Sequence, residues 1–167
     1  MKGTITLDST EGKGSTFCVR LPLDILTDAQ TPEQTFTQNS TVEHDLSSLN
    51  VLIVDDVPTN CIILKALLEE LGVVHVLEEH DGEQALELIQ QGNQFDLILM
   101  DIRMPKMDGL EASQLIRALA YDKPIIAVTA NAFEEDKQSC LKAGMNDFLS
   151  KPIEIDKLKA VLLDNLY

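Results

Sequence analysis

Short apolar runs alternate with amphipathic segments from residue 49 to residue 167 of this chain. The apolar runs predict strands over 50–54, 73–77, 95–100, 124–129 and 146–149. Between and after them, apolar residues recur at helical spacing, which predicts helices over 59–71, 82–91, 109–119, 132–143 and 154–165. Because strands and helices alternate strictly, we expect a parallel α/β sheet with helices on both faces, joined by right-handed crossovers.

Details of the pattern agree with this arrangement. Three of the strand-like runs are apolar almost throughout, as expected of strands buried on both faces. Gly72 and Gly144 stand where helix C-termini are expected, and Pro58 suits the first turn of a helix.

The chain before residue 49 has a different character. Residues 3–23 alternate in a β manner around a turn-rich stretch at 11–15, which predicts a β-hairpin. Residues 24–48 are rich in Thr, Gln, Asp, Glu and Ser and contain no Lys or Arg, as is typical of a flexible acidic linker. We therefore divide the chain into a hairpin (1–23), a linker (24–48) and a larger domain (49–167).

Charge and cysteine content narrow the function classes. The formal net charge of −15 argues against nucleic-acid binding, which needs clustered Lys and Arg. Cys18, Cys61 and Cys140 are scattered without metal-ligand spacing, which indicates reduced thiols and a cytoplasmic setting. The chain has neither the apolar stretch of about 18 residues of a membrane span nor the apolar core of a signal peptide, so we expect no direct membrane contact.

The polar residues that follow the strand-like runs are the candidates for chemistry. Asp55 and Asp56 follow the first run, Asp101 ends the third, Thr129 ends the fourth and Lys151 follows the fifth. Sites in open parallel sheets form at the carboxyl ends of the strands. Carboxylates there suit Mg²⁺, which prefers hard oxygen ligands, while a hydroxyl and an amine can contact phosphoryl oxygens. We expect an Mg²⁺-dependent phosphoryl site.

Asp101 is the candidate nucleophile, because a carboxylate can attack a phosphoryl group to form an aspartyl phosphate. Taken singly, each candidate has a purely structural interpretation: the aspartates and Thr129 as helix caps or turn residues, and Lys151 as surface charge. Their joint placement at four strand ends favours the site.

Residues 49–167 resemble a receiver domain of two-component signalling, the response-regulator fold. The segments that carry the resemblance are Val54-Asp55-Asp56, Leu99-Met100-Asp101-Ile102-Arg103-Met104-Pro105-Lys106-Met107-Asp108-Gly109, Val128-Thr129-Ala130 and Lys151-Pro152. The resemblance implies a doubly wound, flavodoxin-like sheet of five parallel strands in the order 2-1-3-4-5, surrounded by five helices.

The same resemblance implies roles for single residues. Asp101 would be the phosphoacceptor, with a phosphohistidine as donor, and Thr129 and Lys151 would contact the phosphoryl oxygens. Asp56 and Asp101 would bind Mg²⁺ directly and Asp55 largely through water, and the backbone carbonyl of Arg103 would complete the metal site.

Further implied features concern switching. Phe148, three residues before Lys151, stands at the position of a ring that rotates when such domains are phosphorylated, although a plain core role is equally open. The side chains of Arg103 and Asn131 would influence the phosphoryl lifetime. The Lys151–Pro152 peptide is expected to be cis, which costs little before proline.

The segment Glu11-Gly12-Lys13-Gly14-Ser15-Thr16-Phe17 and the strand after it resemble the last hairpin of a histidine-kinase ATP-binding domain. The resemblance implies the C-terminal part of a hybrid sensor kinase, from which we expect no kinase activity because the rest of the kinase is missing. The expected partner is a histidine-kinase dimerisation and phosphotransfer domain or a histidine phosphotransfer protein.

The expected function is a phosphorylation-controlled switch that relays its phosphoryl group or regulates its own kinase. Two alternatives remain open at this point: an Mg²⁺-dependent phosphohydrolase that uses an aspartyl phosphate, and a pseudo-receiver that acts only by binding protein. Against the first, no second aspartate stands two residues after Asp101, where a general acid would be expected.

Overall fold

The computed structural model describes residues 4–10, 14–20, 45–130 and 134–167. The chain divides into two compact units, Met1–Thr41 and Val42–Tyr167. The first unit contains an antiparallel hairpin of β1 (Thr4–Thr10) and β2 (Gly14–Arg20), which is the hairpin that the alternating pattern predicts. Most of the segment interpreted as a linker lies outside the described residues.

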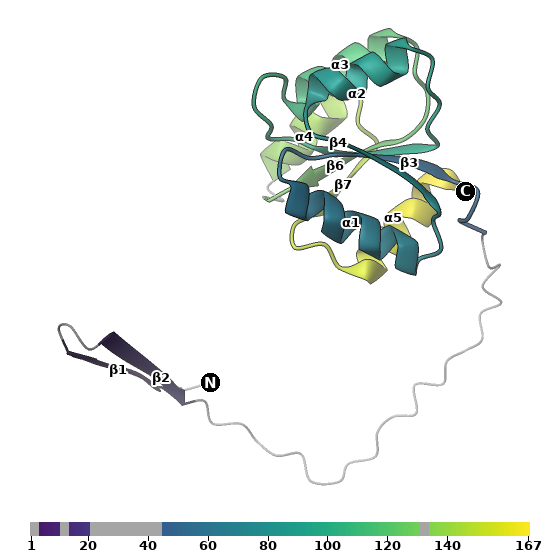
Figure 1. The fold of residues 1–167 in the computed structure, drawn as a ribbon. Coiled ribbons are helices and arrows are strands. Elements are labelled where there is room, and N and C mark those ends of the chain that lie inside the picture. The colour runs from purple at the N-terminus through teal and green to yellow at the C-terminus, as the bar shows by residue number, and fades with distance from the viewer. Residues whose placement is uncertain (1–3, 11–13, 21–44, 131–133) are drawn as a thin grey trace. The chain divides into compact units, whose positions relative to one another are not determined.

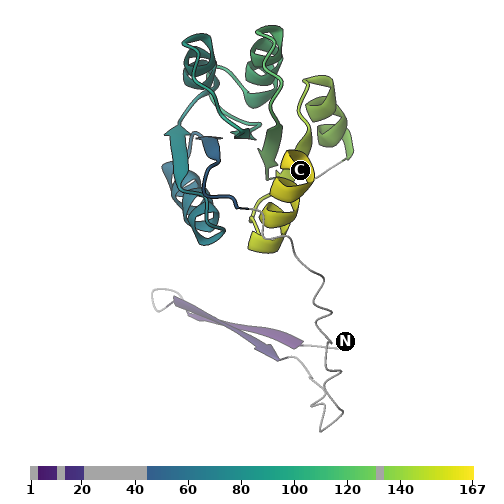
Figure 2. The same cartoon turned by 90° about the vertical axis from the view of Figure 1, so that its right-hand side faces the viewer.

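The second unit is built from five strands and five helices in strict alternation (Figures 1 and 2). In chain order these are β3 (Asn50–Val54), α1 (Pro58–Glu70), β4 (His75–Glu79), α2 (Gly82–Gln90), β5 (Leu97–Asp101), α3 (Gly109–Ala118), β6 (Ile125–Thr129), α4 (Glu134–Lys142), β7 (Asp147–Ser150) and α5 (Ile155–Leu166).

All five strands are parallel, and they lie in the order β4-β3-β5-β6-β7. Counted within this unit, that is the order 2-1-3-4-5, so the expected doubly wound fold is confirmed. The chain reverses its winding direction between β3 and β5, and the crevice at such a switch point is where open α/β sheets bind ligands.

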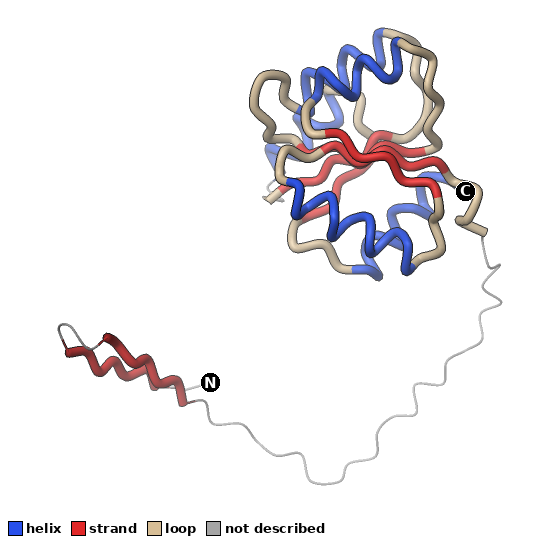
Figure 3. The backbone as a smooth tube through the Cα atoms, in the orientation of Figure 1, coloured by secondary structure: helices blue, strands red, loops and turns tan. Residues whose placement is uncertain are grey.

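The helices form one layer on each face of the sheet (Figures 1 and 3). On one face, Leu64 and Leu68 of α1 pack with Leu158 and Leu162 of α5. On the other face, α2, α3 and α4 contribute Ala85, Ala112, Ile116 and Cys140. Successive strand residues alternate between the two cores: Val51 and Ile53 face the first, and Leu52 and Val54 face the second. This double burial explains why the middle strands are apolar throughout.

Local sequence signals set the helix ends. Pro58 occupies the first turn of α1, as predicted, because its missing N–H would have no helical partner there. Gly72 and Gly144 follow α1 and α4 with φ of +95° and +86°, a conformation that glycine adopts without a steric penalty. Ala120 adopts the corresponding conformation after α3, with φ of +61°, although it carries a side chain.

The second strand of the domain differs from the prediction by two residues. The apolar pair Val73-Val74 suggested a strand over 73–77, but β4 covers His75–Glu79. β4 lies at the edge of the sheet, where Glu78 and Glu79 pair with Ile53 and Val54 while remaining partly exposed. Because one side of an edge strand is open to solvent, it can contain glutamates, and the run of apolar residues therefore did not give the bounds of β4 correctly.

Within the described ranges, no helix combines the length and apolar character needed to cross a membrane.

Candidate phosphoryl-transfer site

The strand ends bring the predicted residues to one edge of the sheet. Asp55 and Asp56 directly follow β3, Asp101 is the last residue of β5, Thr129 is the last of β6, and Lys151 directly follows β7. One carboxylate oxygen from each of the three aspartates lies within 4.8 Å of the other two. Among the described residues, these three aspartates form the one cluster of acidic, histidine or cysteine side chains whose geometry could hold a metal ion.

Lys151 binds two of these carboxylates. Its Nζ donates to Oδ2 of Asp55 at 2.6 Å and to Oδ2 of Asp101 at 2.5 Å. Burial lowers the pKa of Lys151, but the bonds to Asp101 and Asp55 together outweigh it, so the pKa lies above its usual range. Lys151 is therefore a permanent positive charge beside both carboxylates.

Asp101 is 7% exposed, and burial raises the pKa of its carboxyl group, although the bonds from Lys151 and from the backbone N–H of Arg103 act in the opposite direction. The Arg103 N–H donates to Asp101 Oδ1 at 3.0 Å. Both carboxylate oxygens thus have a fixed donor, which orients the group for attack on an electrophile.

Asp55 is only 1% exposed and is held from several directions. Its Oδ1 accepts from the backbone N–H of Val57 at 3.0 Å and from Nδ2 of Asn60 at 2.9 Å, while Oδ2 accepts from Lys151. Asn60, in the first turn of α1, is a supporting residue that sequence reasoning missed, since an isolated polar residue in a helix carries no distinct signal.

Asp56 has a different environment. It is half-buried, and it makes no hydrogen bond or ion pair with the residues that the structure describes. Its carboxylate therefore remains available to a cation beside two carboxylates that Lys151 already binds. Three clustered carboxylates with hard oxygen donors suit Mg²⁺ better than softer metals.

Gly109 is a second supporting residue. It ends the segment Leu99–Gly109, which carries the family resemblance, but the sequence alone indicated no role for it. A Cβ at this position would lie 2.0 Å from the carbonyl oxygen of Asp101. The N–H of Gly109 also donates to the carbonyl of Ile102 at 3.0 Å. The start of α3 can therefore approach the acceptor strand only if residue 109 has no side chain.

The other residues for which the sequence predicted a role are found as follows. Thr129 is 4% exposed, and its carbonyl accepts from the N–H of Lys151 at 2.7 Å. Phe148 is half-buried in β7, with Nζ of Lys137 4.4 Å from the centre of its ring. The Lys151–Pro152 peptide is cis, as expected. Asn131 lies outside the described residues.

Comparison with known proteins agrees with this geometry. The protein-family model of the response regulator receiver domain matches residues 51–163 of this chain. Sensor protein EvgS of Escherichia coli is 38% identical over 162 residues, which is 97% of this chain and 13% of EvgS. The signal transduction histidine-protein kinase BarA of Shigella flexneri is 48% identical over 118 residues, which is 70% of this chain and 13% of BarA. The chain thus spans about an eighth of these relatives' length.

Among solved structures, the receiver domain of sensor histidine kinase PA1611 from Pseudomonas aeruginosa is similar to this chain, with a TM-score of 0.64 and 40% identity. The match covers 71% of this chain and 97% of that domain, which was crystallised with a magnesium ion coordinated in its active site cleft. The family match, the strand order and the arrangement of acidic side chains are consistent with one another, and the chain belongs to the response regulator receiver domain family.

Proposed function

We propose that this chain is the phosphoacceptor switch of a two-component phosphorelay. The observation that carries the proposal is the position of Asp101: a buried carboxylate at a strand end, fixed by Lys151 and the Arg103 N–H, within 4.8 Å of two further carboxylates. Such a site combines a nucleophile with the charges that phosphoryl transfer requires.

In the proposed reaction an oxygen of ionised Asp101 forms a bond to phosphorus as the phosphorus–nitrogen bond of a phosphohistidine breaks. The electron pair returns to the imidazole nitrogen, which takes up a proton. Lys151 and the hydroxyl of Thr129 offer a charge and a donor to the phosphoryl oxygens. Phe148 is proposed as the ring that responds to phosphorylation.

Asp55, Asp56, Asp101 and the backbone carbonyl of Arg103 would hold Mg²⁺, which supplies positive charge against the anionic phosphoryl group when bound. The magnesium ion in the PA1611 receiver domain supports this assignment, as does the available carboxylate of Asp56. With both oxygens of Asp55 bonded to Lys151, Val57 and Asn60, contact between Asp55 and the metal through water is the simpler arrangement.

The donor would be a phosphohistidine domain of a kinase or a separate histidine phosphotransfer protein. Helix α1 presents apolar side chains to solvent: Ile62 is 64% exposed and Ile63 is 50% exposed. A cavity of about 400 Å³ beside α1 is lined by Ile63, Leu64, Pro152 and Ile153 and reaches Lys151. This surface gives a donor protein apolar contacts close to the acceptor.

The decisive experiment is intact mass spectrometry after incubation with acetyl phosphate and Mg²⁺. We expect one hydroxylamine-labile phosphoryl adduct on the wild type and none on Asp101→Asn, with both proteins equally folded by circular dichroism. Residual stoichiometric labelling of the variant at this site would refute the assignment. Absence of any adduct, even with a phosphohistidine donor or beryllofluoride, would favour a binding-only pseudo-receiver, and turnover of phosphate esters would favour a phosphohydrolase.

We further propose that residues 1–23 are the last hairpin of a kinase ATP-binding domain, followed by a linker up to residue 48, in a hybrid sensor kinase. The alignment to EvgS, which covers 97% of this chain, supports this interpretation. A two-stranded hairpin is also marginal alone in water, so β1 and β2 suit a larger parent sheet. Deletion of residues 1–44 is expected to leave the melting temperature and the phosphorylation rate of the receiver unchanged; a fall in either would show that the hairpin supports the receiver.

A further inference from the structure

The segment 102–108 joins the acceptor strand β5 to α3, and its two ends are fixed. At the start, the Arg103 N–H donates to Asp101 Oδ1 at 3.0 Å. At the end, the Gly109 N–H donates to the carbonyl of Ile102 at 3.0 Å, which closes the loop at its base. Movement of this loop would therefore displace the donor that orients the acceptor carboxylate.

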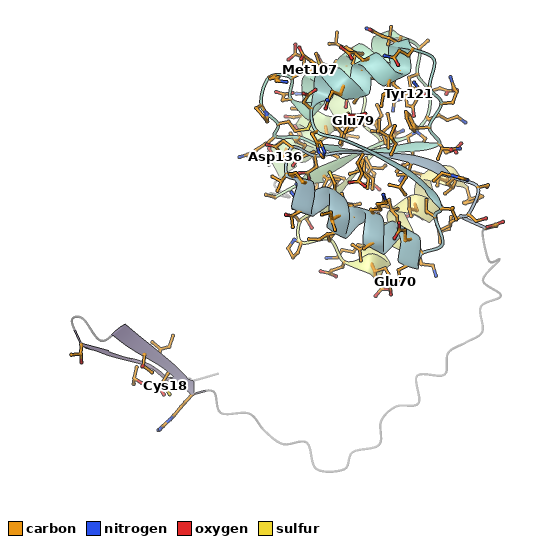
Figure 4. The ribbon with its side chains drawn as sticks, viewed as in Figure 1. Cys18, Glu70, Glu79, Met107, Tyr121 and Asp136 are labelled. Atoms are coloured by element: carbon orange, nitrogen blue, oxygen red, sulfur yellow. The ribbon has the colours of Figure 1, made fainter. Side chains whose placement is uncertain are left out.

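The far end of the loop rests on the beginning of α2. The carbonyl oxygen of Met107 lies 2.8 Å from the point that a Cβ of Gly82 would occupy, so the loop backbone packs against the first residue of the helix. Met107 is found on the side of the sheet that α2 and α3 cover (Figure 4). The neighbouring residue, Lys106, has φ of +67°, a conformation that costs a residue with a side chain energy and persists where the surroundings enforce it.

One ion pair connects this end of the loop to α2. Nζ of Lys106 lies 3.0 Å from Oδ2 of Asp81; the Lys106 side chain is 65% exposed and the Asp81 side chain 13%. The other oxygen of Asp81 caps α2 by accepting from the backbone N–H of Gln84 at 2.9 Å. Asp81 is thus fixed by the helix that it caps, and Lys106 reaches it from a strained backbone position.

We propose that the Lys106–Asp81 ion pair is a latch that holds loop 102–108 in the shape needed to bind Mg²⁺ and accept a phosphoryl group. Lys106 and Asp81 are then positioning residues, which act through Arg103 and Asp101 without touching the metal. The role in metal binding rests on the proposed function above; the role in ordering the loop does not.

The sign of a charge effect separates this latch from simple electrostatics. Lys106→Met removes a positive charge, and by Coulomb attraction alone that change would tighten the binding of a dication nearby. The latch predicts the opposite, because the loop loses its attachment. Asp81→Asn is the matched variant on the other side: asparagine caps a helix as well as aspartate does, so this change removes the charge and keeps the cap.

The test is isothermal titration with MgCl₂ of the full chain as wild type, Lys106→Met, Asp81→Asn and the double variant, with exposed Lys159→Met as a control for lost positive charge. We expect Kd for Mg²⁺ to rise about three- to fivefold in each single variant, as for the loss of one partly exposed ion pair. The double variant should be no weaker than the weaker single variant, because both remove the same contact. Lys159→Met should bind Mg²⁺ as tightly as the wild type or slightly more tightly.

Hydrogen exchange of the metal-free proteins gives a second readout. Amide hydrogens of Arg103, Met104, Lys106 and Met107 should exchange at least about threefold faster in both latch variants than in the wild type, with exchange in the sheet unchanged. Unchanged exchange in this loop, or equal or tighter Mg²⁺ binding by Lys106→Met, would overturn the latch. A wild type that binds no Mg²⁺ would overturn the proposed function and the latch's role in metal binding, while the exchange comparison would still decide whether the pair orders the loop.

Discussion

Replacement of Arg117 by methionine is expected to destabilise the receiver domain strongly, although Arg117 lies on the outside of α3. Its guanidinium donates four hydrogen bonds: to the carbonyls of Gly144, Tyr121 and Lys123 at 2.8, 2.7 and 2.7 Å, and to Oδ1 of Asn146 at 2.6 Å. These acceptors lie on the connections that lead into β6 and β7, so one side chain joins two segments to α3.

The magnitude follows from those bonds. Each hydrogen bond from a charged donor contributes about 1.5 to 3 kcal/mol, but Arg117 is only half-buried and water can replace part of each bond, so we take about 1 kcal/mol apiece. Because the four bonds share one side chain and are not additive, the expected loss is about 3 kcal/mol. For a folded unit of about 120 residues, this lowers the melting temperature by about 12 °C.

The assay is urea denaturation followed by far-ultraviolet circular dichroism. Lys159→Met is the control, because it also removes one positive charge, from an exposed position on α5. Arg117→Lys should fall between the wild type and Arg117→Met, since the single ammonium nitrogen has at most three donors and cannot reproduce four bonds made by three nitrogens of the planar guanidinium. If Arg117→Met and Lys159→Met agree within about 0.5 kcal/mol, a typical value for a surface substitution, the network contributes no stability.

Three further substitutions test the site and the helix ends. Gly109→Ala should lower the free energy of unfolding by more than about 2 kcal/mol and slow labelling by acetyl phosphate, because its Cβ would lie 2.0 Å from the Asp101 carbonyl. Its control is Gly92→Ala, with φ of +88° and no atom within 4 Å of a Cβ, which should lower the free energy of unfolding by about 1 kcal/mol and leave labelling unchanged. Burial raises the pKa of Asp101, so in EDTA its contribution to folding is greatest below the unfolded pKa of about 4 and is lost as pH rises through the folded pKa. The stability of Asp101→Asn relative to the wild type should therefore increase as pH rises above about 4, and parallel pH profiles of the two proteins would contradict this. Ala120→Gly should raise the free energy of unfolding by about 0.5 kcal/mol, because glycine adopts a φ of +61° without the steric strain that alanine has there. Ala160→Gly, inside α5, is the control and should lower the free energy of unfolding by about 1 kcal/mol. Equal losses for the two variants in urea titrations would show that Ala120 is not strained.

The location of the site was predictable from the sequence because it depends on strand ends. In a parallel sheet every carboxyl end faces the same edge, so residues that follow apolar runs converge whatever the details of side-chain packing. Asp55, Asp101 and Lys151 meet for this reason, with Lys151 bonded to both aspartates. The strand order came from resemblance to a family, since alternation alone does not specify which strands are neighbours.

Residues that support the site or the fold through distant contacts were not predictable, because their roles depend on tertiary distances. Lys106 and Asp81 stand 25 positions apart, and no local pattern relates them. Arg117 bonds to Asn146, 29 positions away, by reaching across two connections. Gly109 belongs to a recognised motif, but only the position of the Asp101 carbonyl explains why a side chain is excluded there.

The arrangement of charges at the strand ends also explains why the loop after β5 is held by contacts at both of its ends. Three carboxylates lie within 4.8 Å of one another, and in the described residues Lys151 is the cation that contacts two of them, Asp55 and Asp101. The group therefore retains excess negative charge, which disfavours the folded state and favours the binding of a cation. The same repulsion tends to push the loop after β5 away from β3, unless contacts elsewhere oppose it. The closed base at Gly109 and the Lys106–Asp81 pair at the far end oppose that displacement at two points, so a site that is costly to fold can still keep the shape its chemistry requires.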